Sequence, residues 1–546
     1  MADAHVHTPA PMNEPVRGYA PGSVERTAVR ARLAELADAA TEIPMVINGK
    51  PVMTAARGSV RAPHRHELVV GDYARGGVKE TQAAIDAALA ARRDWAATPY
   101  KDRAAVFLRA AALLAGPYRD SVNAATMLGQ SKTIQQAEID AACELIDFWR
   151  FNVHFGDAIL AQQPQSDPTA WNRLEYRPLE GFVLAISPFN FTSIAGNLPT
   201  APALMGNTVV FKPSPETLLA CHFLMQLLQE AGLPDGVINM VAGDAAQVAG
   251  RALNDPNLAG VHFTGSTGVF QSIWKTVGAN VARYRTYPRL VGETGGKDFI
   301  VAHESADEAS LVTAMVRGAF EYQGQKCSAA SRAYIPQSMW KRIRPQLAEQ
   351  VEGIPMGDVA DFSNFMGAVI DEAAFKRHRT AIAFAKSSAK STVVAGGRSE
   401  GRVGWFVRPT VVETTDPDFR LLQQELFGPI LTVYPYPDRE FAKILDLVDR
   451  TSPYALTGAI FARDREAVVT ASDRLVNAAG NFYVNDKPTG AVVGLQPFGG
   501  ARASGTNDKA GSHLNLLRWT SPRTVKETYV PATDYRYPHM AADPER

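Results

Sequence analysis

Residues 181–191 of this chain read Gly-Phe-Val-Leu-Ala-Ile-Ser-Pro-Phe-Asn-Phe, and this stretch indicates the class of fold. A short, continuously apolar run that ends in a polar turn is typical of a strand buried on both faces of a parallel sheet. Similar runs follow at 207–211, 237–241 and 260–263, with helical patterns between them at 193–205, 217–231 and 245–253. Strands that alternate with helices predict a parallel α/β sheet with right-handed crossovers.

The second half of the chain repeats this alternation. Strand-like runs occur at 299–301, 332–335, 410–412, 430–434, 457–461 and 481–485, and helical patterns separate most of them. We therefore expect a second α/β domain.

The N-terminal part is predicted to be mostly helical. Residues 1–24 are rich in Pro, Gly and Ala without periodicity, which indicates an arm on the surface, and Ser23 is suited to cap the helix that follows. Asn48-Gly49 predicts a hairpin turn within 43–52. Amphipathic patterns predict further helices at 79–95, 101–114, 118–129 and 133–155.

Composition and charge limit the function classes. Lys plus Arg and Asp plus Glu balance at 56 each, so no electrostatic footprint for nucleic acid or an anionic membrane is expected. The three cysteines are far apart and lack zinc-ligand spacing, which argues against disulfides and a metal site and favours a reducing compartment. The N-terminus lacks a secretory pattern, and the apolar runs are too short to span a bilayer. We expect a cytoplasmic protein.

A row of polar residues is predicted at one edge of the first sheet. Ligands of parallel sheets bind beyond the carboxyl ends of the strands, and the loops there carry Ser187, Asn190, Lys212, Ser214 and Ser266. The Gly-x-Gly-x-x-Gly fingerprint is absent. Residues 264–268, Thr-Gly-Ser-Thr-Gly, are the nearest candidate for binding a phosphate at a helix N-terminus, although such a loop is as often a simple turn.

Cys327, in Gly324-Gln325-Lys326-Cys327-Ser328, is the candidate nucleophile. Positive charge or a helix N-terminus stabilises a thiolate, and we expect Lys326 and a helix after Ser328 to supply these. Acyl chemistry also needs an oxyanion donor and a water-activating base, which Asn190 and Glu293 could provide. Taken singly, a lone cysteine is usually a buried hydrophobe, Asn190 a turn residue, and Glu293 a surface charge on a flexible glycine-flanked loop.

Six motifs, taken in their order along the chain, favour the catalytic interpretation of Cys327, Asn190 and Glu293 over the structural one. With them the chain resembles the NAD-dependent aldehyde dehydrogenase superfamily from about residue 40 onward. The motifs are Ser-Pro-Phe-Asn-Phe at 187–191, Phe-Lys-Pro-Ser at 211–214, Phe-Thr-Gly-Ser at 263–266, Glu-Thr-Gly-Gly-Lys at 293–297, Gly-Gln-Lys-Cys at 324–327 and Glu-Leu-Phe-Gly-Pro at 425–429.

The resemblance implies an α/β fold with two Rossmann-related parallel-sheet domains and a β-flap for oligomerisation. It implies a homo-oligomer, either a dimer or a larger assembly. The implied divisions are a cofactor-binding domain at 1–163 and 181–291, a catalytic domain at 292–486, a substrate-anchoring loop region at 487–514, and the flap and tail at 164–180 and 515–546.

The resemblance also implies the roles of the site residues. Cys327 would be the nucleophile, Asn190 and the Cys327 N–H the oxyanion hole, and Glu293 the general base. Many members carry a carboxylate three residues after the ribose-binding lysine, where this chain has Pro215, so the preference for NAD over NADP stays open. The implied NAD contacts are Ser187, Lys212, Ser214, Gly265, Ser266, Thr267, Gly268, Val269, Glu425 and Phe427.

Within the superfamily, the chain is most similar to the branch that oxidises L-glutamate gamma-semialdehyde to L-glutamate in proline breakdown. Residues 187–192, 326–329 and 497–508 carry this similarity. It implies that Glu144, otherwise typical of a helix surface, receives the substrate ammonium. The implied carboxylate site is Ser328 with the backbone of Gly490 and Ala491, and the implied contacts of the carbon chain are Phe191 and Phe498.

Three alternatives are less well supported. A succinate semialdehyde dehydrogenase would place a basic side chain in the substrate tunnel. A CoA-acylating member would not need Glu293, and an inactive relative would be expected to lack Cys327, Asn190 or Glu293. A transient contact with a proline dehydrogenase is a further expectation.

Overall fold

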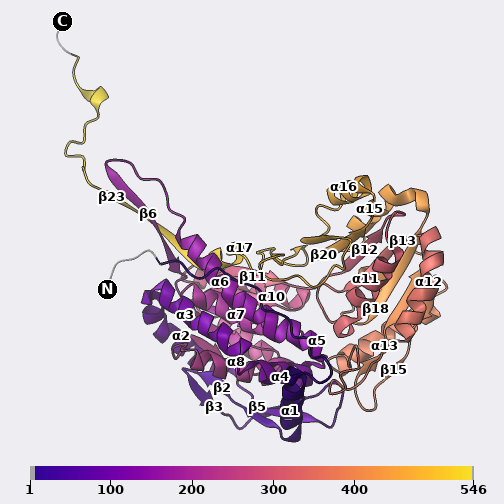
Figure 1. Cartoon of the computed structure of the whole chain (residues 1–546). Helices are drawn as coiled ribbons and strands as arrows, with labels where there is room; N and C mark the ends of the chain where they lie inside the picture. The colour runs from indigo at the N-terminus through magenta and orange to yellow at the C-terminus, as the bar shows by residue number, and fades with distance from the viewer. Residues whose placement is uncertain (1–5, 544–546) are drawn as a thin grey trace.

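The computed structural model describes residues 6–543, which form two lobes that each contain a seven-stranded sheet (Figure 1). The sheet of the first lobe has the order β11-β10-β7-β8-β9-β2-β3. Its first five strands are parallel, and β2 and β3 form an antiparallel hairpin at one edge. The strands are β2 (Met45–Ile47), β3 (Lys50–Val52), β7 (Phe182–Ile186), β8 (Thr208–Lys212), β9 (Ile238–Met240), β10 (Leu258–Thr264) and β11 (Arg289–Glu293).

The sheet of the second lobe has the order β14-β17-β18-β13-β12-β20-β21, and only β14 is antiparallel to its neighbour. Alternate residues of β12 face opposite sides: Ile300 packs with α11 and α12, whereas Phe299 and Val301 pack with α15 and α16. Both faces are therefore apolar, which explains the unbroken apolar runs in the sequence. The strands are β12 (Asp298–Ala302), β13 (Ala330–Pro336), β14 (Ser391–Ala395), β17 (Thr410–Thr414), β18 (Ile430–Tyr436), β20 (Thr457–Phe461) and β21 (Asn481–Val484).

The helices lie close to the predicted positions. In the first lobe they are α1 (Val24–Asp38), α2 (Val78–Ala97), α3 (Tyr100–Ala115), α4 (Arg119–Gln130), α7 (Thr192–Leu204), α8 (Leu218–Glu230), α9 (Ala245–Leu253) and α10 (Thr267–Ala279). In the second lobe they are α11 (Glu308–Phe320), α12 (Gln337–Glu352), α13 (Glu372–Ser387), α15 (Phe441–Arg450) and α16 (Arg465–Arg474). Ser23 accepts a hydrogen bond from the Arg26 N–H, which confirms it as the cap of α1.

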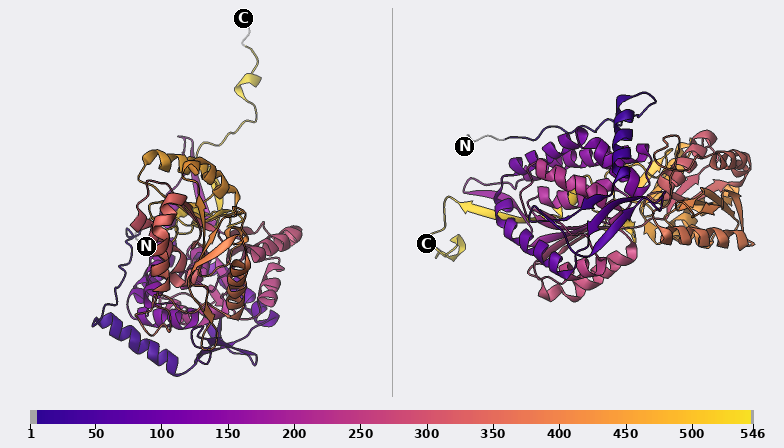
Figure 2. Two further views of the ribbon diagram at one scale, coloured as in Figure 1. Left: turned by 90° about the vertical axis from the view of Figure 1, so that its right-hand side faces the viewer. Right: turned by 90° about the horizontal axis from the view of Figure 1, so that it is seen from below.

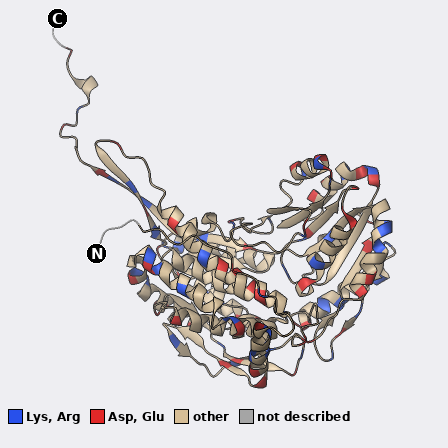
Figure 3. Cartoon of the chain, in the orientation of Figure 1, with Lys and Arg blue, Asp and Glu red and all other residues tan. Residues whose placement is uncertain are grey.

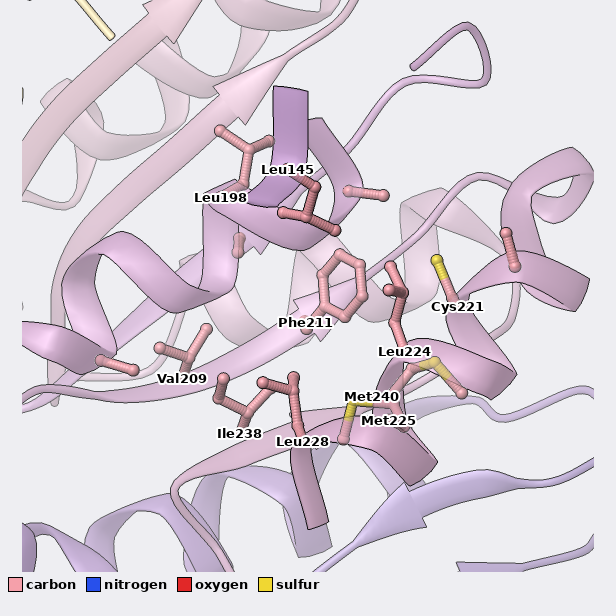
Figure 4. Close-up of a cluster of buried hydrophobic side chains, with 14 of the residues drawn as sticks. Leu145, Leu198, Val209, Phe211, Cys221, Leu224, Met225, Leu228, Ile238 and Met240 are labelled. Atoms are coloured by element: carbon pink, nitrogen blue, oxygen red, sulfur yellow. The ribbon is translucent and has the colours of Figure 1, made fainter. Parts of the chain in front are cut away.

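Part of the core of the first lobe lies between its sheet and the surrounding helices (Figure 4). Phe211 of β8 and Met240 of β9 pack there with Leu224 of α8 and Leu198 of α7. Cys221 is fully buried in this cluster, and burial raises the pKa of its thiol to about 12. Cys221 is thus a core residue and not a reactive thiol.

The helix predicted at 133–155 is confirmed and contains a π-helical segment, because α5 (Ile134–Ala137) continues as a π-helix at Glu138–Glu144 and then as α6 (Leu145–Leu160). One prediction of local structure is wrong. Glu293 does not lie on a flexible loop; it is the last residue of β11 and pairs with Thr264 of β10. Pairing with a neighbouring strand overrides the flexibility that the flanking glycines indicate.

A two-stranded ribbon stands away from the first lobe (Figure 1). It consists of β6 (Ala170–Pro178) and β23 (Thr520–Thr528), which pair antiparallel along their whole lengths. This confirms that the two distant segments assigned to the flap lie together. The flap and both ends of the described range, residues 6 and 543, lie at the end of the first lobe that is remote from the second lobe (Figure 2).

Charged residues of both signs are mixed on the outer helices of both lobes (Figure 3). Within residues 6–543, no helix combines the length and the apolar character needed to cross a bilayer. The described part of the N-terminal arm lies against the first lobe, and its Tyr19 is buried.

The arm is attached through Glu138, the first residue of the π-helix and fully buried. Its carboxylate accepts hydrogen bonds from the Arg17 N–H at 2.9 Å, the Tyr19 hydroxyl at 2.8 Å and Asn123 Nδ2 at 2.9 Å, and it forms an ion pair with Arg119. One carboxylate therefore joins the arm, α4 and the π-helix.

Replacing Glu138 by Ala is expected to destabilise the fold by about 3 kcal/mol or more, because it leaves Arg119 buried with one ionic partner fewer. The measurement is the midpoint of chemical denaturation. Glu67→Ala removes an exposed carboxylate and should leave the midpoint unchanged. Equal midpoints for the two variants would contradict the role of Glu138.

Candidate functional site

Residues from both lobes meet around Cys327, which lies in the turn between a 3₁₀ helix (Glu321–Gly324) and β13. Asn190 follows β7 of the first lobe, and its side chain is buried. Asn190 Nδ2 donates a hydrogen bond of 3.0 Å to the carbonyl of Gln325, two residues before Cys327. The primary amide has a second N–H, so Asn190 can still donate to a ligand.

The thiol of Cys327 is not activated in the predicted way. Lys326 forms an ion pair of 3.0 Å with Glu321, and β13 rather than a helix follows the turn. Burial, followed by the nearby carboxyl groups of Asp298, Glu293 and Glu425, raises the pKa of the Cys327 thiol. The site therefore holds a neutral thiol until a proton acceptor becomes ionised or a ligand changes the surroundings.

The Glu293 carboxylate accepts a hydrogen bond of 3.0 Å from the Gly500 N–H. A Cβ on Gly499 or Gly505 would approach a Glu293 oxygen to 3.1 Å, so the glycine-rich segment leaves room for the carboxylate. Burial raises the pKa of Glu293 well above its ordinary value, Asp508 adds to this, and the Gly500 N–H and Lys509 oppose it. A buried carboxyl group with a raised pKa is suited to act as a general base.

Glu425 and Phe427 line the same small pocket as Cys327. The Gly296 N–H donates to Glu425 at 2.9 Å, and a Cβ on Gly295 would lie 2.2 Å from a Glu425 oxygen. A glycine is therefore required at residue 295 for this approach. Phe427 packs edge to face against Phe189, with ring centroids 5.6 Å apart.

The residues predicted to bind a nucleotide follow the carboxyl ends of β7, β8 and β10. The buried Ser187 hydroxyl has no hydrogen-bond partner within residues 6–543. Ser266 caps α10 and accepts from the Val269 N–H at 3.4 Å, while a Cβ on Gly268 would meet no atom within 4 Å. The turn therefore leaves open space in front of a helix N-terminus, which suits an anion.

Lys212 ends β8 and is mostly buried. Burial lowers the pKa of its ammonium, and the charge of Glu216 opposes this. The Ser214 hydroxyl donates its hydrogen bond to the Glu216 carboxylate at 2.5 Å, so this hydroxyl can only accept a further hydrogen bond. Glu216 thus supplies a carboxylate close to Lys212, although Pro215 occupies the position where relatives carry one.

The predicted substrate residues lie on four segments: the π-helix, the turn after β7, the turn of Cys327 and the 487–514 segment. Ser328 shares a hydrogen bond of 2.7 Å with the Thr489 hydroxyl, which ties the 487–514 segment to the turn of Cys327. Gly490 has φ +95°, a conformation that favours glycine. Phe498 is held by backbone hydrogen bonds with Ala510 at 2.7 and 3.0 Å.

Glu144 ends the π-helix. Burial, with Asp140 as the nearest carboxylate that adds to it, raises the pKa of Glu144 to about 8, while Lys132 opposes the shift. The Nζ atom of Lys132 lies 4.3 Å from the ring centroid of Phe191. The structure therefore brings Glu144 and Phe191 close to the same buried ammonium.

Sequence reasoning missed Thr489, Lys132, Asp140 and Tyr322. No motif singles out the first three, because each lies in a turn or helix of ordinary composition. Tyr322 directly precedes Gln323-Gly324, and all three residues have positive φ. Gly324 is the only one of the three residues whose type favours positive φ, so the sequence gives only a weak signal for this bend.

The chain is similar to known proteins along nearly all of its length. A model of the aldehyde dehydrogenase family matches residues 53–525. A Schizosaccharomyces pombe protein named probable delta-1-pyrroline-5-carboxylate dehydrogenase is 50% identical over 541 residues, 98% of this chain and 99% of that protein. The mitochondrial delta-1-pyrroline-5-carboxylate dehydrogenase of Bos taurus is 50% identical over 529 residues, 97% of this chain and 94% of that protein.

The chain is also similar to solved structures along nearly all of its length. The crystal structure of delta-pyrroline-5-carboxylate dehydrogenase from Mycobacterium tuberculosis bound with NAD superimposes with a TM-score of 0.96 at 59% identity. The match covers 99% of this chain and all of that one.

The raised pKa of Cys327 predicts an unusual pH dependence of its alkylation. Only the thiolate reacts, so the rate with iodoacetamide should keep rising above about pH 9, where an ordinary thiol is already mostly ionised. The measurement is the labelling rate of this residue by mass spectrometry between neutral and alkaline pH. The Cys327→Ser variant is the control, because any labelling that remains in it comes from the two buried thiols. A labelling rate of Cys327 that levels off near pH 8 would contradict the prediction.

Proposed function

Because the chain belongs to the aldehyde dehydrogenase family, we propose that it oxidises L-glutamate gamma-semialdehyde, formed from delta-1-pyrroline-5-carboxylate, to L-glutamate with NAD. This reaction is the second step of proline breakdown. The observation that carries the proposal is the meeting of Asn190, Cys327 and Glu293 between the two lobes, with Glu144 and Ser328 near the thiol. The names of relatives that match over nearly the whole chain support the substrate.

In the first half-reaction, Cys327 Sγ attacks the aldehyde carbon. The second N–H of Asn190 and the backbone N–H of Cys327 donate to the oxyanion that forms, and the Gln325 carbonyl keeps the amide oriented. The thiol loses its proton as it attacks, and an ionised carboxylate such as Glu293 would accept that proton. Burial and the negative charge of ionised carboxylates near the thiol oppose its loss.

In the second half-reaction, Glu293 removes a proton from water, and the water attacks the thioester on Cys327. Breaking the carbon–sulfur bond releases the carboxylic acid and returns the thiol. Glu293 can act only after it loses its own proton, so its raised pKa moves this step toward alkaline pH.

The chain's residues fit NAD. When bound, NAD supplies the acceptor for the hydride that leaves the substrate carbon. We propose that residues 265–269 receive its phosphates, that Ser187 donates its unpaired hydroxyl, and that Lys212 holds the adenosine ribose. Glu216 beside Lys212 favours a free ribose hydroxyl over a 2′-phosphate, which supports NAD over NADP. Glu425 and Phe427 would hold the nicotinamide end.

The substrate's charged head would be bound at two places. Ser328 and the backbone of Gly490 and Ala491 are proposed to receive the α-carboxylate, and Glu144 the ammonium. An ammonium beside Glu144 would lower its pKa and pair with the ionised form, which offsets the cost of burying both charges. Phe191 and Phe498 would contact the carbon chain.

The larger organisation is proposed on the same basis. The two sheets support the cofactor-binding and catalytic domains, although β11 crosses the boundary that we expected at residue 292. The exposed ribbon of β6 and β23 supports a homo-oligomer that pairs through the flap. A transient contact with a proline dehydrogenase and a cytoplasmic location remain proposals, and some relatives are named as mitochondrial.

The decisive experiment measures reduction of NAD on addition of delta-1-pyrroline-5-carboxylate, with succinate semialdehyde and acetaldehyde in parallel. Turnover should be strong with delta-1-pyrroline-5-carboxylate, weak with the other two, and absent in Cys327→Ala. A marked preference for succinate semialdehyde would reject the roles of Glu144 and Ser328 and leave the thiol chemistry in place.

Glu293→Gln should separate the two half-reactions. The variant can still form the thioester but lacks the base for its hydrolysis, so we expect one burst of NADH per site and a steady rate lower by about 100-fold or more. Rapid mixing with an absorbance readout checks this. In the unaltered enzyme the hydrolysis rate should rise with pH as Glu293 ionises; a rate independent of pH would contradict the assignment.

A further inference from the structure

A buried ammonium lies between the two segments that carry Asn190 and Cys327. Lys132 follows α4 and is almost fully buried. Its Nζ lies 2.5 Å from Asp140 Oδ2, 4.3 Å from the ring centroid of Phe191 and 4.4 Å from that of Tyr322. Two aromatic faces and one carboxylate thus surround a single positive charge.

We infer that Lys132 is a positioning residue that aligns the oxyanion donor Asn190 with the nucleophile Cys327. The inference rests on the proposed function for the reaction in which this alignment is used. Lys132 has no assigned role in the mechanism described above, and it contacts neither thiol nor amide directly.

On the Asn190 side, the ion pair of Lys132 and Asp140 contacts the Phe191 side chain and the backbone at the start of α7. Phe191, which Lys132 contacts, is next to Asn190 and precedes α7. Asp140 accepts hydrogen bonds from the first two N–H groups of α7, Thr192 at 3.0 Å and Ser193 at 2.9 Å. A carboxylate at a helix N-terminus is stabilising, so the pair fixes the start of the helix that follows Asn190.

On the Cys327 side, Lys132 supports a bent segment. Tyr322 and Gln323 have φ of 50° and 55°, which is unfavourable for residues other than glycine and persists only where surrounding contacts hold it. The Tyr322 ring packs on the Lys132 ammonium, and Gln323 Nε2 donates to the carbonyl of Ser131 at 3.0 Å. The Ser131-Lys132 corner therefore holds the bend that leads to Gln325 and Cys327.

The charge of Lys132 is essential to this arrangement. Burying an ammonium costs free energy that is offset only when it is paired, and here Asp140 and the two ring faces provide the partners. A methionine has similar length and fits an apolar gap, but it attracts neither the carboxylate nor the ring faces. Replacing Lys132 by Met should leave Asp140 unpaired and release both segments.

The test compares Lys132→Met with the double variant Lys132→Met/Asp140→Asn, which removes both charges. A misalignment of about 1 Å can cost about 100-fold in rate, so we expect kcat with delta-1-pyrroline-5-carboxylate to fall by about that factor in both variants. The KM should change by less than about threefold, because the groups proposed to bind the substrate head are retained. The double variant should recover the thermal midpoint that the single variant loses, without recovering kcat.

Glu144→Gln is the matched comparison, since it lies on the same π-helix but is proposed to bind the substrate. It should raise KM and weaken the binding of L-glutamate in calorimetry, whereas the double variant should bind L-glutamate like the unaltered enzyme. An unchanged kcat in the folded double variant overturns the inference, as does a kcat that returns together with the thermal midpoint.

Failure of the proposed function is recognised separately. The unaltered enzyme would then oxidise another aldehyde in preference, and the same variants would be compared with that aldehyde. A loss of kcat at unchanged KM would still support Lys132 as a positioning residue, and an unchanged kcat would still reject it.

Discussion

The hydrogen bond from Asn190 to the carbonyl of Gln325 joins the two lobes at the point where their chemistry meets. Asn190 lies in the segment that follows β7 of the first sheet, and Gln325 leads into β13 of the second. The proposed nucleophile Cys327 and the proposed side-chain oxyanion donor Asn190 come from different lobes, so the proposed site depends on the contact between the lobes. Glu293 adds a second link, because its carboxylate accepts from Gly500 of the segment that follows the second sheet.

Burial of carboxyl groups gives this site its electrostatic character. Glu293, Asp298 and Glu425 all have raised pKa values. Burial, followed by the charges of these carboxyl groups when they are ionised, raises the pKa of the Cys327 thiol. A neutral thiol is less prone to oxidation or unwanted alkylation than a thiolate. Burial also raises the pKa of Glu293, which suits the role of general base proposed for it.

The π-helix at Glu138–Glu144 links the outer structure to the site. Its first residue attaches the N-terminal arm, Asp140 pairs with Lys132, and Glu144 is proposed to receive the substrate ammonium. A π-helix widens the turn and changes which residues share a face, and such turns are frequent at functional sites. Here the wider turn lets one short segment direct three carboxyl groups to three different partners.

The sequence by itself determined the alternation of strands and helices and the positions of both sheets, and its motifs singled out Asn190, Cys327 and Glu293 as the residues proposed to react. Apolar periodicity and turn residues are local signals, and the six motifs carried the rest of this information. Only the tertiary structure decided that Glu293 ends a strand, that Lys326 pairs with Glu321 away from the thiol, and that Lys132 lies between Phe191 and Tyr322. These features depend on contacts between segments far apart in the chain. Periodicity and spacing are local patterns, and they do not show which distant segments come into contact or how their side chains are oriented.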